Sequence, residues 1–383
     1  MADSAAPVAS QRPEKGRFLS FVKKNAVLVI AFCAAVISAL LVPPDGEYLG
    51  YFDVKTLCCL FGTLAVVCAL KNIHFFSIVA SRIIQVTGNS RIAALALIYI
   101  TFIGSMLIAN DMALITFLPL GYYVFSTTGR KDEVATVFIL QNIAANLGGM
   151  LTPFGNPQNL YLYQHFNIPT GEFMQIMLLP FLVAVALITL CCFLIPKHSL
   201  RVSPQKDKTL PAMRTSLYIF LFSLTIMMVF RLLPPWLVLS AVVIGLIILD
   251  RKALRQVDYG LLCTFVCFFI FSGNMGRLPV VRDFFSGLLE KSTLLTSVLS
   301  CQVISNVPSA ILLSQFTDNY ASLLVGVNIG GAGTLIASLA SLITFREYTS
   351  HYREWTGKYI LRFTLLNFGF LILLTIFSLA IGR

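Results

Sequence analysis

The chain has 383 residues, of which 57% are hydrophobic and only 12% are charged, and its mean hydropathy is +0.83. A soluble domain carries about 25% charged residues, so this composition excludes an ordinary water-soluble globular protein and indicates a membrane protein. The net charge of +11 does not indicate nucleic-acid binding. The basic residues are scattered through short loops between apolar runs, as they are in the cytoplasmic loops of membrane proteins.

Seven plain membrane spans are predicted in chain order, at 26–42, 54–70, 173–195, 216–230, 236–249, 259–271 and 360–381. A span needs about 20 apolar residues, and several of these segments lie near the lower limit of length. The first span follows a polar, basic tail at 1–23 and has no cleavage site after it. We therefore expect this span to remain as an anchor, with the tail in the cytoplasm.

Two further apolar regions are interrupted by polar residues and predict re-entrant hairpins. The region 92–125 is interrupted by Asn110-Asp111, and the region 293–316 by Ser305-Asn306. Irregular backbone at membrane depth is tolerated only where protein or a water-filled cavity surrounds it. Each hairpin should therefore bring its polar tip into the interior of the protein.

A helix that breaks in its middle follows each hairpin. The first, at 135–163, contains Asn-Leu-Gly-Gly at 146–149 and two prolines shortly afterwards. The second, at 321–345, contains Asn-Ile-Gly-Gly at 328–331. Glycine and proline at this density cannot form a continuous helix, so two discontinuous helices are predicted.

The hairpins, the breaks and the helix starts at Asp53 and Asp258 recur in the same order, which indicates two repeats. The first repeat spans 24–196 and the second 235–383, and a basic linker with one extra span lies between them at 197–234. This arrangement makes about nine spans in all, counting the two broken helices. An odd number of crossings separates the repeats, so they should have inverted topology, as in secondary transporters. The predicted fold class is an all-α polytopic membrane protein.

The distribution of basic residues sets the predicted orientation. With the N-terminus in the cytoplasm, 22 of the 28 lysines and arginines fall on the inner side, which is a strong positive-inside asymmetry. The C-terminus then lies outside. The residues left outside are Lys55, Arg231, Arg277, Arg282, Lys291 and Arg383.

The breaks and tips are the predicted binding site, because a broken helix exposes unpaired carbonyl and N–H groups. Carbonyls can coordinate a cation and helix N-termini can hold an anion. We expect Asn110, Asn146 and Asn156 to line a first cluster, and Ser305, Asn306 and Asn328 a second. The expected substrate-binding residues are Asn110, Asn156, Asn159, Ser305, Asn306, Thr152 and Thr334. The expected cation- or proton-coupling residues are Asp111, Asn110, Asn146, Gly148, Asn306, Asn328 and Gly330.

Asp111 is the only acid deep within an apolar run. Burial raises the pKa of a carboxyl group and a nearby cation lowers it. Asp111 is therefore predicted to carry a proton, to ligate Na⁺, or to exchange one for the other. The alternative is a protonated carboxyl group that caps a half-helix.

An enzyme is not indicated. The nine cysteines lie within apolar segments without metal-ligand spacing, and the four histidines fall in loops. Neither a metal site nor a catalytic Ser-His pair is predicted at membrane depth. No cofactor is expected apart from the coupling ion, Na⁺ or H⁺.

Four motifs resemble the ion transporter superfamily, in particular its citrate-transporter-like permeases, which include divalent-anion/sodium symporters and arsenite permeases. They are Ala-Asn-Asp at 109–111, Thr-Pro-Phe-Gly-Asn-Pro-Gln-Asn at 152–159, Ser-Asn-Val-Pro at 305–308 and Asn-Ile-Gly-Gly at 328–331. The resemblance covers about residues 24–383. It implies a homodimer with a fixed scaffold and a moving transport part. The symporters have Ser-Asn-Thr at both tips, whereas here the threonine is missing from both.

The leading hypothesis is a secondary active transporter of a small anion, such as citrate or a dicarboxylate, coupled to Na⁺ or H⁺ by an alternating-access, elevator-type mechanism. The alternative is an arsenite/antimonite exporter or an Na⁺/H⁺ antiporter with Asp111 as its proton site. Expected partners are the anion, the coupling cation and the lipid bilayer. The expected location is a bacterial inner membrane.

Overall fold

The computed structural model describes residues 25–85, 87–126, 131–199 and 209–382, so the predicted tail at 1–23 lies outside the described residues. The regular secondary structure of the described residues is helical, apart from one isolated bridge between Asn89 and Ser199. Seven of its helices are long and apolar enough to cross a membrane. The fold class predicted from the sequence, an all-α polytopic membrane protein, is confirmed.

Six of these seven helices match predicted spans or the first half of a broken helix, and the seventh, α5, is a hairpin arm. The remaining predicted spans are the short helices α2 (Ala26–Leu41) and α11 (Pro235–Leu249) and the broken helix near the C-terminus. The count of about nine spans therefore stands.

The hairpins are present at the predicted tips. Helix α5 (Ser90–Ile108) turns at Ala109 into α6 (Asn110–Ser126), and α15 (Thr293–Ile304) turns at Ser305 into α16 (Asn306–Leu313). Side chains of Asn89 and Ser292 accept hydrogen bonds from the first turns of α5 and α15, which fixes where each hairpin begins.

The two breaks also lie where the glycines and prolines predict them. Helix α7 (Lys131–Gly148) ends in the short 3₁₀ turn η2 (Gly149–Leu151), and α8 (Pro157–His165) begins directly after Asn156. Helix α17 (Tyr320–Gly330) stops before an irregular segment, and α18 (Leu339–His351) begins after Ser338. Proline at the first position of α8 suits a helix start, since its missing N–H would be unpaired there anyway.

Helices α3 (Val54–Asn72) and α13 (Tyr259–Arg277) begin at equivalent caps. The carboxylate of Asp53 accepts from the N–H of Thr56, and that of Asp258 accepts from the N–H of Leu261. The sequence correspondence between Asp53 and Asp258 is therefore also a structural one. Each of the two helices is followed by an amphipathic helix that the sequence analysis missed, α4 (Phe75–Gln85) and α14 (Pro279–Lys291). Both were too short and too mixed in polarity to stand out as spans.

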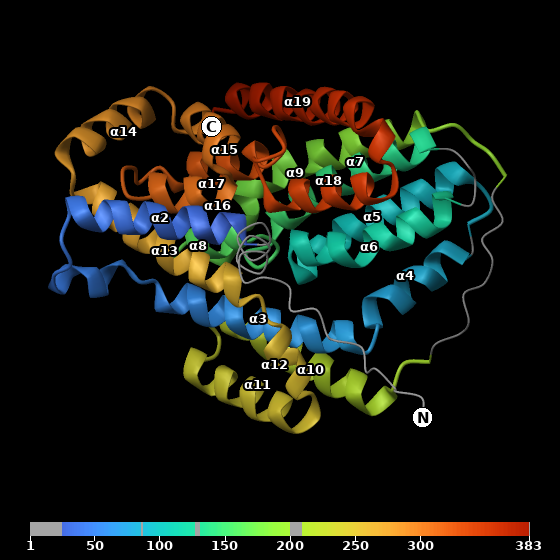
Figure 1. Cartoon of the computed structure of the whole chain (residues 1–383), viewed down its shortest axis with the longest axis horizontal. Coiled ribbons are helices and arrows are strands. Elements are labelled where there is room, and N and C mark those ends of the chain that lie inside the picture. Colours follow the sequence, from blue (N-terminus) through green and yellow to red (C-terminus); the bar gives the residue numbers. More distant parts are fainter. Residues whose placement is uncertain (1–24, 86, 127–130, 200–208, 383) are drawn as a thin grey trace, which may run out of the picture.

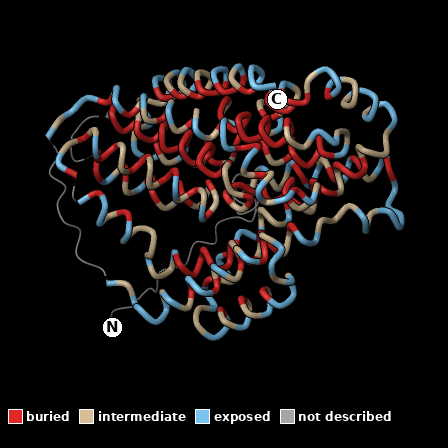
Figure 2. Tube along the Cα trace, turned by 180° about the vertical axis from the view of Figure 1, so that it is seen from behind, coloured by how far each residue is buried: buried red, intermediate tan, exposed pale blue. Residues whose placement is uncertain are grey.

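The helices group into a hairpin body and a helix bundle, and α10 (Ala212–Val229), α11 and α12 (Arg251–Gln256) of the bundle lie apart from the hairpin body, while α13 packs against it (Figure 1). The hairpin body contains α5 to α8, α9 (Thr170–Phe193), α15 to α18 and α19 (Thr356–Ala380). The helix bundle has two parts with few contacts between them, one of α3 with α10, α11 and α12, and one of α13 with α2. Buried residues concentrate in the hairpin body, whereas the outer faces of the helix bundle are exposed (Figure 2). An apolar exposed face is expected where lipid is the solvent.

The two bodies meet mainly through α3 packed on α8 and α13 packed on α16. At this boundary the rings of Tyr161 and Phe269 lie 5.7 Å apart. Arg231, in the turn between α10 and α11, donates to the carbonyl of Ile168 and to the side chain of Gln164, both at 3.2 Å. These bonds connect the helix bundle to the end of α8.

Candidate functional site

The two hairpin tips have the same backbone geometry. Ala109 has φ 65° and Ser305 has φ 74°, a region that residues other than glycine rarely occupy. The next residue, Asn110 or Asn306, is 3% exposed. Its side-chain oxygen accepts from the following N–H, of Asp111 or of Val307, at 2.9 Å. Strained backbone of this kind persists only where surrounding packing fixes it.

Each break packs closely against the first arm of its own hairpin. A Cβ at Gly148 would collide with the carbonyl of Phe102 and lie 2.6 Å from the hydroxyl of Ser105. A Cβ at Gly330 would lie 2.8 Å from Cys301, which stands where Ser105 does in the first repeat. Glycine is therefore required at both positions, because the helix approaches the hairpin more closely than a side chain allows.

In each repeat, a threonine that follows the glycines of the break also bonds to the first arm of the hairpin. Thr152 donates to the carbonyl of Met106 at 2.8 Å, and Thr334 donates to the carbonyl of Gln302 at 3.1 Å. Both threonines were predicted to bind substrate. In this structure their hydroxyls are already bonded to the backbone of the first hairpin arm.

The two breaks cross each other in opposite directions and share hydrogen bonds. The side chain of Asn146 donates to Ser338 at 3.1 Å, and that of Asn156 donates to Asn328 at 3.1 Å. In both pairs, an asparagine at one break meets the residue just before the second half-helix of the other repeat. Helix α7 accordingly packs against α18, and α17 against α8, as expected for inverted repeats.

The predicted division into two separate clusters is therefore not what the structure shows. Asn110 does bond to Asn146, at 3.1 Å. However, Asn156, which we assigned to the first cluster, pairs with Asn328 of the second. The sequence pattern showed which residues stand at each break but not that the breaks cross, and the crossing makes one continuous network of both clusters.

The network includes Asn159, one of the predicted site residues, and also extends to residues that were not predicted. Asn328 donates to the side-chain oxygen of Asn159, and Asn159 donates to the carbonyl of Gly149 at 3.0 Å. Asn142 of α7, which the sequence analysis did not single out, donates to Ser341 of α18 at 3.3 Å. The signal available in the sequence was an asparagine within an apolar run one turn before the first break, because a buried amide needs partners.

Asp111 lies in the first turn of α6, beside Asn110. Its Oδ1 atom is buried and has no hydrogen-bond partner. The side-chain oxygen of Asn156 is likewise buried without a partner. Unpaired buried oxygens are costly and suit a cation or a proton, and the N-terminal end of a helix also stabilises a carboxylate.

The network consists of amides, hydroxyls and backbone carbonyls. Within the part of the chain that the structure describes, no group of three His, Cys, Asp or Glu residues is placed to hold a metal ion. The nine cysteines are all free thiols.

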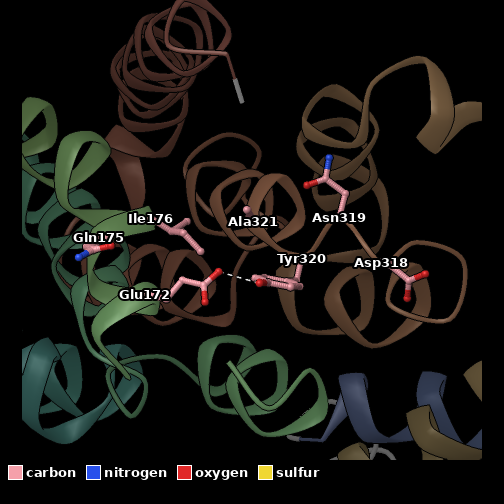
Figure 3. A pocket seen from close by; sticks show the side chains of 7 residues that line it. All are labelled: Glu172, Gln175, Ile176, Asp318, Asn319, Tyr320 and Ala321. Carbon is pink, nitrogen blue, oxygen red and sulfur yellow. Dashed lines mark hydrogen bonds between the residues drawn. The ribbon is translucent and has the colours of Figure 1, made fainter. Parts of the chain in front are cut away.

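A separate polar cavity of about 250 Å³ lies between the start of α9 and the start of α17 (Figure 3). Glu172, Asp318 and Asn319 line it, and the hydroxyl of Tyr320 donates to Glu172 at 2.6 Å. None of the predicted site residues lines this cavity. It is therefore distinct from the asparagine network.

Comparisons with known proteins point to transport. A family model described as "Citrate transporter" matches residues 18–325. The chain is 32% identical over 309 residues to an uncharacterized transporter of Methanocaldococcus jannaschii, covering 80% of this chain and 84% of the relative. It is 28% identical to the inner membrane protein YbiR of Escherichia coli, covering 77% and 80%.

Among solved structures, the YdaH transporter of Alcanivorax borkumensis resembles this fold with a TM-score of 0.48 and 12% identity, over 91% of this chain and 96% of that one.

Proposed function

The chain belongs to the citrate transporter family, and on that premise we propose that it is a secondary active transporter of a small anion, such as citrate or a dicarboxylate, coupled to Na⁺ or H⁺. The observation that best supports this proposal is the hydrogen-bond network that joins the two breaks. The carboxylate oxygen of Asp111, the residue after Asn110 of that network, is buried and has no partner. In transporters with inverted repeats, broken helices of this kind form the substrate and ion sites near the bilayer midplane.

The network accounts for how an anion could be held without a basic side chain. Helices α6 and α16 both begin at the tips, and the N-terminal end of a helix attracts negative charge. Amide groups of Asn110 and Asn306 stand beside those ends. A cation at Asp111 would neutralise the carboxylate and add attraction for an anion nearby. Anion binding and cation binding would then be coupled, as symport requires.

An elevator-type movement is part of the proposal. It is supported by the division into a hairpin body, which carries the whole network, and a helix bundle that contacts it chiefly at α8 and α16. The amphipathic helices α4 and α14 join the two bodies at equivalent points of the repeats. We also propose a homodimer in a bacterial inner membrane with its N-terminus in the cytoplasm, which cross-linking and accessibility labelling would test.

The experiment is uptake of labelled citrate and succinate into proteoliposomes, with Na⁺ and pH gradients imposed separately. We expect one gradient to drive accumulation above the equilibrium level. Anion-independent Na⁺/H⁺ exchange, with no uptake under either gradient, would contradict anion symport and support an antiporter.

A second candidate, an arsenite/antimonite exporter or a Na⁺/H⁺ antiporter, is favoured by one specific feature. Asp111 is an acid at a tip where the second repeat has Val307. An acid with an unpaired oxygen suits proton exchange without any organic anion. Inclusion of arsenite in the same vesicles, with efflux as the readout, distinguishes the two candidates.

A further inference from the structure

A cavity of about 340 Å³ lies where the helix bundle meets the end of α8, apart from the asparagine network. Its walls come from the start of α3, from the turn between α10 and α11, and from α8. The described residues that line it include the basic side chains of Lys55 and Arg231 and no acidic side chain. Most of the others are apolar, among them Met228, Leu232 and Leu233. A cavity of this composition suits an anionic group that is attached to an apolar one.

Arg231 ends α10 in a conformation that is unusual for arginine. Its φ is 62°, in the left-handed region where glycine is the residue normally found after a helix. The side chain offsets this strain through its contacts with the hairpin body. Its guanidinium group donates to Gln164 and Ile168, both at 3.2 Å, and lies 4.1 Å from the centre of the Tyr163 ring. These contacts hold the charge of Arg231 at the wall of the cavity.

The guanidinium group of Arg231 keeps donors for a further partner. Each of its terminal nitrogens carries a pair of N–H groups and uses one of them, for the carbonyl of Ile168 or of Tyr163. Neither Arg231 nor Lys55 has an ion pair within the part of the chain that the structure describes. The cavity therefore presents two positive charges that no described carboxylate neutralises.

The surroundings of the cavity are those of the membrane surface. Trp236, in the first turn of α11, is 71% exposed, and Leu232 is 67% exposed. Val54, next to Lys55 in the first turn of α3, is 62% exposed. Tryptophan is enriched where a membrane meets water, and lysine and arginine lie at the ends of spans. The cavity is therefore placed at the level of the lipid headgroups, with apolar side chains beside it that face lipid.

We propose that this cavity binds a membrane phospholipid with an anionic headgroup, such as phosphatidylglycerol. The lipid phosphate accepts from the remaining N–H groups of Arg231 and from the ammonium group of Lys55, and hydrogen bonds between charged groups are the strong ones. The acyl chains lie along Leu232 and the neighbouring exposed apolar residues. This site goes beyond the proposed function, because it holds whatever substrate the asparagine network carries.

A lipid suits the cavity better than a soluble anion does. Arginine and lysine bind a phosphate group from either source. Only a lipid also covers the apolar lining and the exposed side chains beside it, and the burial of those surfaces adds to the affinity. A soluble anion would leave them in contact with water.

A lipid at this place would also connect the helix bundle to the hairpin body. Lys55 belongs to α3 of the bundle, Gln164 belongs to α8 of the hairpin body, and Arg231 already bonds across the boundary. A ligand favours the conformation that it binds best. The lipid should therefore stabilise the arrangement of the two bodies that this structure shows.

Native mass spectrometry of the full-length protein in detergent tests the site. The probes are phosphatidylglycerol, phosphatidylcholine with the same acyl chains, and sn-glycerol 3-phosphate as the soluble phosphate. We expect one phosphatidylglycerol to remain bound to each chain, with weaker retention of phosphatidylcholine and none of glycerol 3-phosphate. Lys55→Glu should need at least about tenfold more phosphatidylglycerol for the same bound fraction, since it removes one charged contact and repels the phosphate.

Lys291→Glu is the matched control, because it makes the same change of charge at an exposed lysine that does not line the cavity. It should bind phosphatidylglycerol as the wild type does. Lys55→Glu should fold, since an acid in the first turn of a helix is favourable. Thermal unfolding gives a second measurement: phosphatidylglycerol should raise the melting temperature of the wild type and of Lys291→Glu, and raise that of Lys55→Glu less.

Equal retention of phosphatidylglycerol by wild type and Lys55→Glu would overturn the proposal, because the lipid would then lie elsewhere. Equal retention of phosphatidylcholine would overturn the recognition of an anionic headgroup. Stabilisation by glycerol 3-phosphate as large as that by the lipid would show a site for a soluble anion instead. None of these outcomes bears on the transport of a small anion, which the uptake experiment tests separately.

Discussion

The two repeats place equivalent backbone around different chemistry. Both tips turn through a residue of positive φ, both breaks press a glycine against the preceding hairpin, and both anchor a threonine to that hairpin. Yet one half carries Asp111 and the other carries Gln302. The shared features are those that packing two broken helices against each other requires. The differing ones change the charge at the tips and the hydrogen-bonding groups at the breaks. Symmetry therefore identifies the residues with structural roles, and we propose that the residues that depart from it give selectivity.

The largest effect is expected from Asp111→Asn, which removes the charge and keeps the shape. We expect cation-driven accumulation to fall to the level of passive equilibration, because the first tip loses its only acid. Uptake under imposed Na⁺ and pH gradients checks this. Asp318→Asn, at the polar cavity between α9 and α17, is the matched control and should transport normally. A folded Asp111→Asn protein with full coupling would show that the acid only caps α6.

The breaks themselves should respond unequally to a methyl group. Gly148→Ala directs a Cβ at the carbonyl of Phe102, which is fixed backbone, whereas Gly330→Ala directs it at the side chain of Cys301. Overpacking typically costs about 1–3 kcal/mol, and we expect Gly148→Ala to lie at the upper end and Gly330→Ala at the lower.

Thermal unfolding in detergent measures this difference. Gly369→Ala, in α19 with open space around it, should leave the melting temperature unchanged or slightly raised. Equal losses at the two breaks would mean that the Phe102 backbone relaxes as easily as the Cys301 side chain.

The bonds that cross between repeats offer a test of the single network. Asn156→Ala and Asn328→Ala should each destabilise by about 1–3 kcal/mol, since each leaves a buried partner unpaired. Their double mutant should lose less than the sum, with a coupling energy of roughly 0.5–3 kcal/mol. Strict additivity in chemical unfolding would indicate that the two side chains do not bond to each other, and that the predicted separate clusters were correct.

The smallest and most symmetric effect concerns the two threonines. Thr152→Val and Thr334→Val each remove one donor to a hairpin carbonyl, so both should lower stability by about 0.5–1.5 kcal/mol and by similar amounts. Unfolding measurements check the equality. A selective rise in the substrate concentration needed for half-maximal uptake in one variant, without loss of stability, would return that threonine to the substrate-binding role predicted from the sequence.

Much of the fold was predictable because its signals are local. Apolar runs identify helices in lipid. The glycines and prolines at 148–157 and the glycines at 330–333 interrupt these helices, whatever packs around them in the folded protein. The amphipathic helices α4 and α14 escaped detection, because a short helix on a surface has no such strong signal. The aspartate caps at Asp53 and Asp258 were visible in the sequence as correspondences, and only the structure showed their bonds.

The sequence by itself determined the class of protein, the order of the elements and the residues at the two tips and breaks. It did so because burial in lipid makes polar and helix-breaking residues conspicuous. Only the tertiary structure decided that Asn146 meets Ser338 and Asn156 meets Asn328, which joins the predicted clusters into one network. Only it revealed that the amide of Gln302 donates to the carbonyl of Gly330 and lies where a side chain at Gly333 would be. Those contacts join segments far apart in the chain, and no local pattern specifies which buried amide will meet which carbonyl.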